Sequence, residues 1–187
     1  MVGIRIIRVR VKLNERPLLA VLHNVTLVEH YYMDLYTAIK TLHILTSTIL
    51  FGTGIGIAFF MLRSWFTKNV HEKFYAARNT VLADYLFTFP AAVIQPVSGV
   101  ALIYTAGFDW TSQWLMTTYV IYVIAGLCWL PVVWIQIQLK NMCKDASENG
   151  AELPQRYYTL FKLWFALGWP AFGGFIVIFY LMVAKPV

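Results

Sequence analysis

Charged residues are scarce in this sequence. Only 13% of its 187 residues are Asp, Glu, Lys or Arg, against roughly 25% in an ordinary soluble domain. In their place, 59% of the residues are hydrophobic and 17% are aromatic. Ser/Gly-rich and Pro-rich linkers are also missing, so nothing divides the chain into separate domains. The composition therefore predicts a single domain whose solvent is the lipid bilayer.

The sequence also lacks the short motifs from which a reaction can be read. It has no Walker-type loop, no histidine pair at metal spacing, no serine nucleophile elbow and no Gly-rich dinucleotide fingerprint. Its two cysteines, Cys128 and Cys143, form neither a disulfide pattern nor a metal motif. The net charge of +6 is not arranged as a basic face with interleaved aromatics, so we expect no nucleic-acid partner.

Carboxylates are missing from the central parts of the apolar stretches. Asp84 is expected one turn inside one end of such a stretch, and no other Asp or Glu lies further in. Proton-coupled carriers usually need a carboxylate within the membrane. A small-molecule permease is therefore the least favoured class.

Four apolar stretches are present, each long enough to cross a bilayer, which takes about 20 helical residues. Backbone amides inside a membrane must be satisfied within the segment, so these stretches must be helices. We predict an all-α polytopic membrane protein, a bundle of four transmembrane helices occupying residues 33–187. The expected helices cover residues 35–62, 80–106, 115–139 and 158–183.

The basic residues predict the orientation of the bundle. The first connection carries Arg63, Lys68, Lys73 and Arg78, the third carries Lys140, Lys144, Arg156 and Lys162, and the second has no Lys or Arg. Basic loops stay in the cytoplasm. We therefore expect a multi-pass protein of the inner (plasma) membrane, with both chain ends and the loop at 107–114 on the outer side.

Residues 1–32 do not fit this pattern. They alternate apolar and basic residues and then form a short apolar stretch broken by His23 and Asn24. Their five basic residues would lie on the outer side, against the rule that orients the rest. We expect an N-terminal extension outside the natural chain, with translation starting at Met33. The alternative is a peripheral amphipathic segment.

Glycines in the first helix indicate close packing. Gly52 and Gly56 have the small-xxx-small spacing that lets two helix backbones approach each other. A comparable region around Pro170 lies in the fourth helix. Either these two helices touch, or Gly52 and Gly56 join two copies in a homo-oligomer.

His43 is the candidate for chemistry. It lies about 12 Å along the first helix from residue 35, at 1.5 Å per residue, with Lys40 one turn before it on the same face. Ionisable groups at such depth are costly and mark sites. A neutral imidazole there can ligate haem iron, relay a proton or hydrogen-bond a neighbouring helix.

A haem at His43 would need its second axial ligand from another residue type, because the later predicted helices contain no histidine. Met116 and Met182 are the candidates on the same half of the bundle, and five-coordinate iron is the alternative. Gln95 begins a polar patch in the second helix that can line a pocket with His43.

Three segments carry a family resemblance: Leu35-Tyr-Thr-Ala-Ile-Lys-Thr-Leu-His43-Ile, Gln95-Pro-Val-Ser-Gly99, and the ending Leu181-Met-Val-Ala-Lys185-Pro186. Together they resemble a bacterial family of predicted inner-membrane proteins of unknown function. More distantly, the chain is similar to the HemJ-type protoporphyrinogen oxidases. That resemblance implies a membrane oxidoreductase with haem b or another tetrapyrrole, in which His43 is the haem-associated ligand, Arg63 the helix-end arginine and Lys185 the terminal lysine.

These observations support two functions. The favoured one is an inner-membrane protein with a haem or other redox group near His43 and a membrane redox partner. The other is a non-catalytic accessory or assembly protein, in which His43 and the glycines serve helix packing. The sequence assigns no reaction.

Overall fold

The computed structural model describes residues 15–186, with the side chains of 15–26, 28 and 29 excepted. Every regular element in this part of the chain is helical, which confirms the all-α class. The elements are α1 (Glu15–Trp65), α2 (Val70–Ala83), the π-helical turn η1 (Asp84–Thr88), α3 (Phe89–Ala106), α4 (Gln113–Asn149) and α5 (Gln155–Ala184).

Four segments in the described residues are long and apolar enough to cross a membrane, as the sequence predicts. They are His30–Trp65, Val70–Ala106, Gln113–Asn149 and Gln155–Ala184, with mean hydropathies of 1.9, 1.8, 2.1 and 1.9 in their most apolar windows. Each is longer than the apolar stretch on which it was expected. Polar residues outside the hydrocarbon continue the helices, so the connections shrink to 66–69, 107–112 and 150–154.

Two units divide the chain, and their boundary lies between Ala38 and Ile39, inside α1. In the first unit the described part is helical from Glu15 onward, and the rings of Tyr31 and Tyr32 meet edge to face at 6.3 Å. The basic, alternating stretch at residues 1–13 lies outside the described residues. Everything that follows concerns the second unit.

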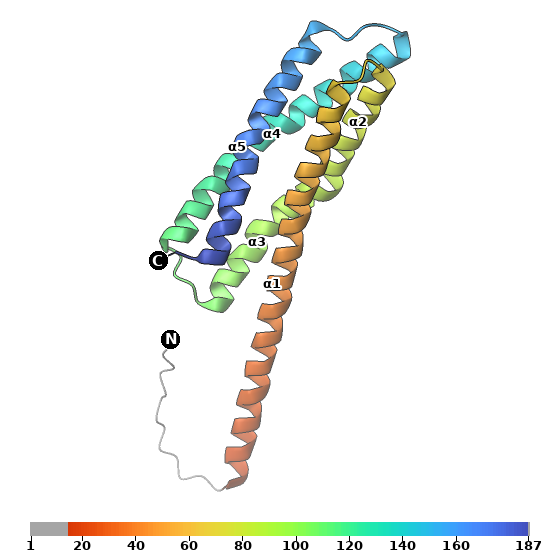
Figure 1. Cartoon of the computed structure of the whole chain (residues 1–187). Coiled ribbons are helices and arrows are strands. Elements are labelled where there is room, and N and C mark those ends of the chain that lie inside the picture. The colour runs from red at the N-terminus through yellow and green to blue at the C-terminus, as the bar shows by residue number, and fades with distance from the viewer. Residues whose placement is uncertain (1–14, 187) are drawn as a thin grey trace. The chain divides into compact units, whose positions relative to one another are not determined.

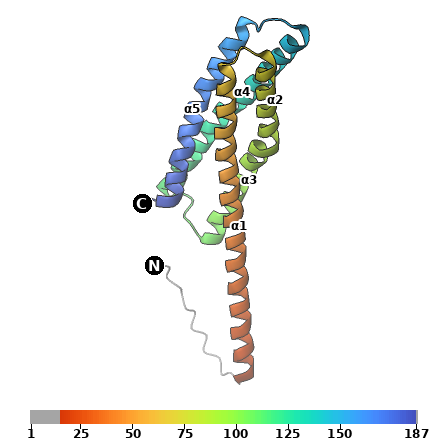
Figure 2. The same ribbon diagram turned by 45° about the vertical axis from the view of Figure 1, so that its right-hand side comes forward.

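In the second unit α5 runs along α4, and α2 packs against α4 (Figures 1 and 2). A large core lies where α1, α2, α4 and α5 meet near the 66–69 and 150–154 connections; it comprises Met61, Ala77, Val132, Ile135, Leu139, Cys143, Tyr157, Leu160, Phe161 and Trp164. A small core of Ile103, Trp114, Leu115 and Leu181 lies near the 107–112 connection. Packing is therefore concentrated toward the two ends of the bundle.

Helix α1 contacts α5 through aromatic rings. Phe51 stacks on Phe172 at 5.1 Å, and Trp65 lies 4.7 Å from Phe161 between ring centroids. Glycines are not what joins these helices, because a Cβ added at Gly52 or Gly56 would meet nothing within 4 Å. The close small-residue approach occurs elsewhere, at Gly174 of α5, where an added Cβ would lie 2.9 Å from Cγ2 of Ile121 on α4.

A π-helical turn joins α2 to α3 without a break in the helical segment. The N–H of Phe89 bonds to the carbonyl of Asp84, five residues back, which widens this turn. Pro90 follows directly and has no N–H to donate to the preceding turn. Turns of this kind are rare and often occur at functional sites.

Lys73 donates hydrogen bonds to backbone carbonyls at the C-terminal end of α1. The last carbonyls of a helix have no partner within it. The Lys73 Nζ, on a side chain only 4% exposed, donates to the carbonyls of Ser64 at 2.7 Å and Trp65 at 3.2 Å. The positive charge also complements the negative end of the helix dipole. This lysine, expected in a loop, is thus a buried link between α2 and α1.

Candidate functional site

His43 lies on α1, partly buried against α3. Its Nδ1 is 2.7 Å from the hydroxyl Oγ of Ser98. A Cβ added at Gly99 would come 3.5 Å from the ring carbon Cε1, so α3 presents its smallest residue next to the imidazole. The polar patch predicted in the second transmembrane helix therefore does meet His43.

The hydrogen bonds of Ser98 favour one tautomer of His43. Ser98 Oγ donates to the carbonyl of Ile94 at 2.7 Å, and a hydroxyl has only one proton to give. The same Oγ must then accept from His43, which assigns the ring proton to Nδ1. The lone pair on Nε2 is left for another partner. Metal-ligating histidines usually have this arrangement, with the other ring nitrogen held by a hydrogen bond.

Gln95 fastens the same region from α3. Its side-chain Nε2 donates to the carbonyl of His43 at 2.7 Å and to Oγ1 of Thr46 at 2.5 Å. Gln95 and Thr46 are both buried, at 9% and 5% exposure. Because the amide bonds to the backbone of His43 itself, it fixes where along α1 the imidazole meets α3.

The two candidate sulfur ligands lie in other surroundings. Met182 on α5 packs against the small core. Met116, near the start of α4, is 49% exposed. The hydrogen bonds of His43 described above lead to Ser98 and Gln95 on α3, and a methionine ligand stays a prediction.

The structure also shows where three basic residues that the sequence named as site candidates lie. Lys40 is exposed on α1, one turn before His43, and Arg63 is exposed at the end of the same helix. Arg63 lines a second cavity of about 730 Å³ between α1 and α2. Lys185 ends α5 with a left-handed φ of 42°, and its Nζ lies 4.3 Å from the ring centre of Phe108. That cation–π contact fastens the C-terminal end to the 107–112 connection.

Sequence reasoning missed Asp84. It was expected near the end of a transmembrane stretch, but α2, η1 and α3 form one continuous span, and Asp84 lies 3% exposed within it. It lines a cavity of about 680 Å³ among α1, η1, α3, α4 and α5. The signal was Pro90, six residues later, which marks an irregular turn, but a proline alone does not show which side chain turns inward.

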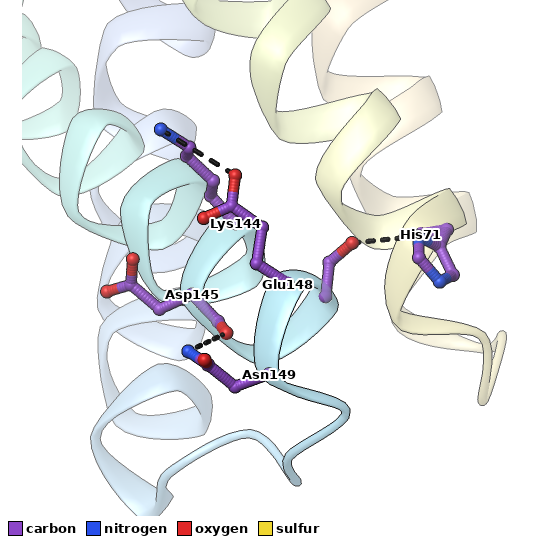
Figure 3. A network of polar contacts seen from close by, with 6 residues as sticks. His71, Lys144, Asp145, Glu148 and Asn149 are labelled. Atoms are coloured by element: carbon purple, nitrogen blue, oxygen red, sulfur yellow. Dashed lines mark hydrogen bonds and ion pairs between the residues drawn. The ribbon is translucent and has the colours of Figure 1, made fainter.

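A polar network joins α2 to α4 at the end near the 66–69 connection (Figure 3). His71, expected in a solvated loop, lies in the first turn of α2. Its Nδ1 is 2.7 Å from Oγ of Ser147, and Lys144 pairs with Glu148 at 3.8 Å. These side chains lie at the surface and pair with one another through this hydrogen bond and this ion pair. Among the side chains that the structure describes, no three of His, Cys, Asp or Glu are grouped to hold a metal ion.

Comparison with known protein families gives a match over most of the chain. The sequence model of a family described as "Predicted integral membrane protein (DUF2269)" covers residues 37–186. No curated protein and no solved structure matches the chain. The family match covers the whole of the second unit, which carries His43 and Asp84, apart from its last residue.

Proposed function

Because the chain belongs to this family of predicted integral membrane proteins (DUF2269), we propose that it is a multi-pass protein of the bacterial inner membrane that holds haem b, or another tetrapyrrole, at His43. The distant similarity to the HemJ-type oxidases supports this role, as does the chemistry of the ring. The observation that carries it is the bond between His43 Nδ1 and Ser98 Oγ, which leaves Nε2 as a free ligand.

The residues around His43 fit one ligand for a haem iron. His43 supplies the nitrogen ligand, Ser98 orients it, and Gln95 fixes its backbone. Met116 and Met182 are the candidates that would add a sulfur ligand, and His43 alone would suffice without them. Lys40, one turn from His43, is a cation suited to a haem propionate. When bound, the haem supplies one-electron chemistry, and a membrane redox partner would exchange the electron.

An absorption spectrum tests this proposal. The protein purified in detergent, after reconstitution with haem, is expected to show a Soret band that disappears or shifts in His43→Ala. Ser98→Ala should keep the band but weaken haem binding about 10- to 100-fold, because such orienting partners contribute that much to metal affinity. His71→Ala, which alters an exposed histidine of α2, is the matched control and should match the wild type. A colourless reconstituted wild type contradicts the proposal.

The second candidate is an accessory or assembly subunit. It is favoured by the same bonds, since Gln95 and Ser98 link α3 to α1 whether or not a ligand is present. In that case His43 is a packing residue, and Gly52 and Gly56 join copies of the chain. Their open surroundings support the homo-oligomer, because no described residue lies within 4 Å of the positions that their Cβ atoms would take. Two results together would support this function. The wild-type protein would be colourless, and the mass of the Gly52→Leu variant would fall to that of a monomer.

The orientation proposed for this protein places the 66–69 and 150–154 connections in the cytoplasm. Their helix ends carry the basic residues, and the 107–112 connection carries none. In a Cys128→Ala chain, Thr111→Cys should react with a membrane-impermeant maleimide on intact cells. Lys68→Cys and Glu152→Cys should react only after permeabilisation. Labelling of Lys68→Cys on intact cells would show that the orientation is the opposite of the one proposed.

A further inference from the structure

The cavity of about 680 Å³ next to Asp84 has the size of a small-molecule site. Its walls are apolar and aromatic, and they come from four of the long helices as well as the π-turn. The aromatic rings that line it include Phe51, Trp129, Trp164, Trp169, Phe172 and Phe175. It does not include His43, so it is a site separate from the one proposed for haem.

Polar side chains at one part of this wall are buried without partners. Asp84, Thr88 and Gln136 are 3%, 7% and 1% exposed. Both carboxylate oxygens of Asp84, Oγ1 of Thr88 and Oε1 of Gln136 are buried without a hydrogen bond, and so are the indole nitrogens of Trp129 and Trp164. Thr88, Gln136 and Trp129 lie close to the carboxyl and interact with it, but no pair reaches the geometry of a formed hydrogen bond. Unsatisfied groups gathered at one cavity indicate a ligand, because buried polar groups are otherwise paired.

The carboxyl of this wall has no counter-charge among the described residues that line the cavity. Among the described residues that line the cavity, Asp84 is the one ionisable carboxylate, and there is no lysine, arginine or histidine. Lys73, the buried cation of α2, is committed to the end of α1. A buried carboxylate without a counter-charge is costly within a membrane. A cationic group on the ligand would remove that cost.

The form of the cavity favours an organic cation over a metal ion. Hard cations need about six oxygen ligands, and the cavity offers one carboxylate. Indole faces such as those of Trp129 and Trp164 attract ammonium-type cations. The π-turn sets Asp84 toward α4, where Gln136 and Trp129 lie, and so gathers these groups from two chain segments.

Access from the bilayer is open along the helices. Three of the lining side chains, Phe59 on α1, Leu127 on α4 and Trp169 on α5, are 56%, 64% and 62% exposed. A lipid-soluble molecule can therefore enter between helices without crossing a polar surface. We propose that this cavity binds a lipophilic organic cation, with the charged group at Asp84 and Gln136 and the apolar body among the aromatic rings.

Tetraphenylphosphonium and tetraphenylborate test the proposal, because they share a shape and differ in the sign of their charge. In equilibrium dialysis with the full-length protein in detergent, the cation should bind saturably and the borate should not. Asp84→Asn keeps the shape of the side chain and should weaken cation binding by about tenfold or more. Asp109→Asn is the control: hydrogen bonds from the backbone and side chain of Thr111 lower the pKa of that exposed carboxyl, so it is charged at neutral pH. Its removal should leave binding unchanged.

A second pair of variants separates binding from folding. Gly168 lines the cavity and Gly173, on the same helix, does not, and an added Cβ meets nothing within 4 Å at either. Gly168→Leu should reduce binding by filling the cavity, whereas Gly173→Leu should not. Equal binding of the borate, no saturable binding by the wild type, or unaltered binding in both Asp84→Asn and Gly168→Leu would each overturn the proposal. The spectrum at His43 should not change in Asp84→Asn, which keeps the two sites experimentally distinct.

Discussion

Phe161→Ala is expected to lower the free energy of unfolding by about 3 kcal/mol, at the lower end of the range for removing a buried aromatic side chain. Phe161 is 3% exposed in the large core, and its ring lies 4.7 Å from Trp65 and 5.5 Å from Trp164 between centroids. The lower end applies because helices separated in lipid keep an apolar solvent, so mainly packing contacts are lost. Steric trapping or denaturation in bicelles measures the change.

Phe165→Ala is the control for this variant. Phe165 lies one turn further along α5, is 38% exposed, and has its ring edge to face with Trp169 at 6.0 Å. Its removal should cost much less. If both variants lost the same stability, the large core would not be what holds α1 against α5.

Gly174→Leu should also destabilise the bundle, by about 2 kcal/mol, as overpacking of a close contact does. An added Cβ at Gly174 would lie 2.9 Å from Cγ2 of Ile121. That methyl group cannot turn away cheaply, because β-branched side chains in helices have one preferred rotamer. The backbones of α4 and α5 must therefore move apart. The same unfolding assay and cross-linking between α4 and α5 report the change.

Gly52→Leu serves as the control, because nothing lies within 4 Å of its added Cβ. The free energy of unfolding of the Gly52→Leu monomer should equal that of the wild-type monomer. Its mass by light scattering reports separately on the proposed homo-oligomer. Unaltered stability of Gly174→Leu would contradict the close approach of α5 to Ile121.

The candidate site could be predicted in part. His43 and Gln95 were both identifiable as polar groups in apolar stretches, and the structure brings them together with Ser98 through hydrogen bonds. No role could be assigned to the methionines in the same way, because the sequence of a membrane helix does not show whether a thioether faces lipid, the core or a ligand. Whether His43 binds haem stays a prediction for the spectrum to decide.

Asp84 and His71 show where sequence reasoning fell short. His71 precedes the apolar stretch that was expected to begin at residue 80 and was placed in a loop, whereas Asp84 was placed one turn inside that stretch. In the structure α2 begins at Val70, so His71 is helical and Asp84 lies 14 residues inside a continuous span. Amphipathic helix outside the hydrocarbon lacks the uniform apolar signal by which membrane spans are recognised.

By itself the sequence determined that four helices are long and apolar enough to cross a membrane, because the transfer of an apolar stretch into lipid is a local free energy that each stretch carries within its own residues. Only the tertiary structure decided which side chains meet. The partners of His43, the close approach at Gly174 and the cavity at Asp84 depend on how each helix is rotated about its axis. That rotation is set by packing and a few hydrogen bonds between helices, which no single stretch contains.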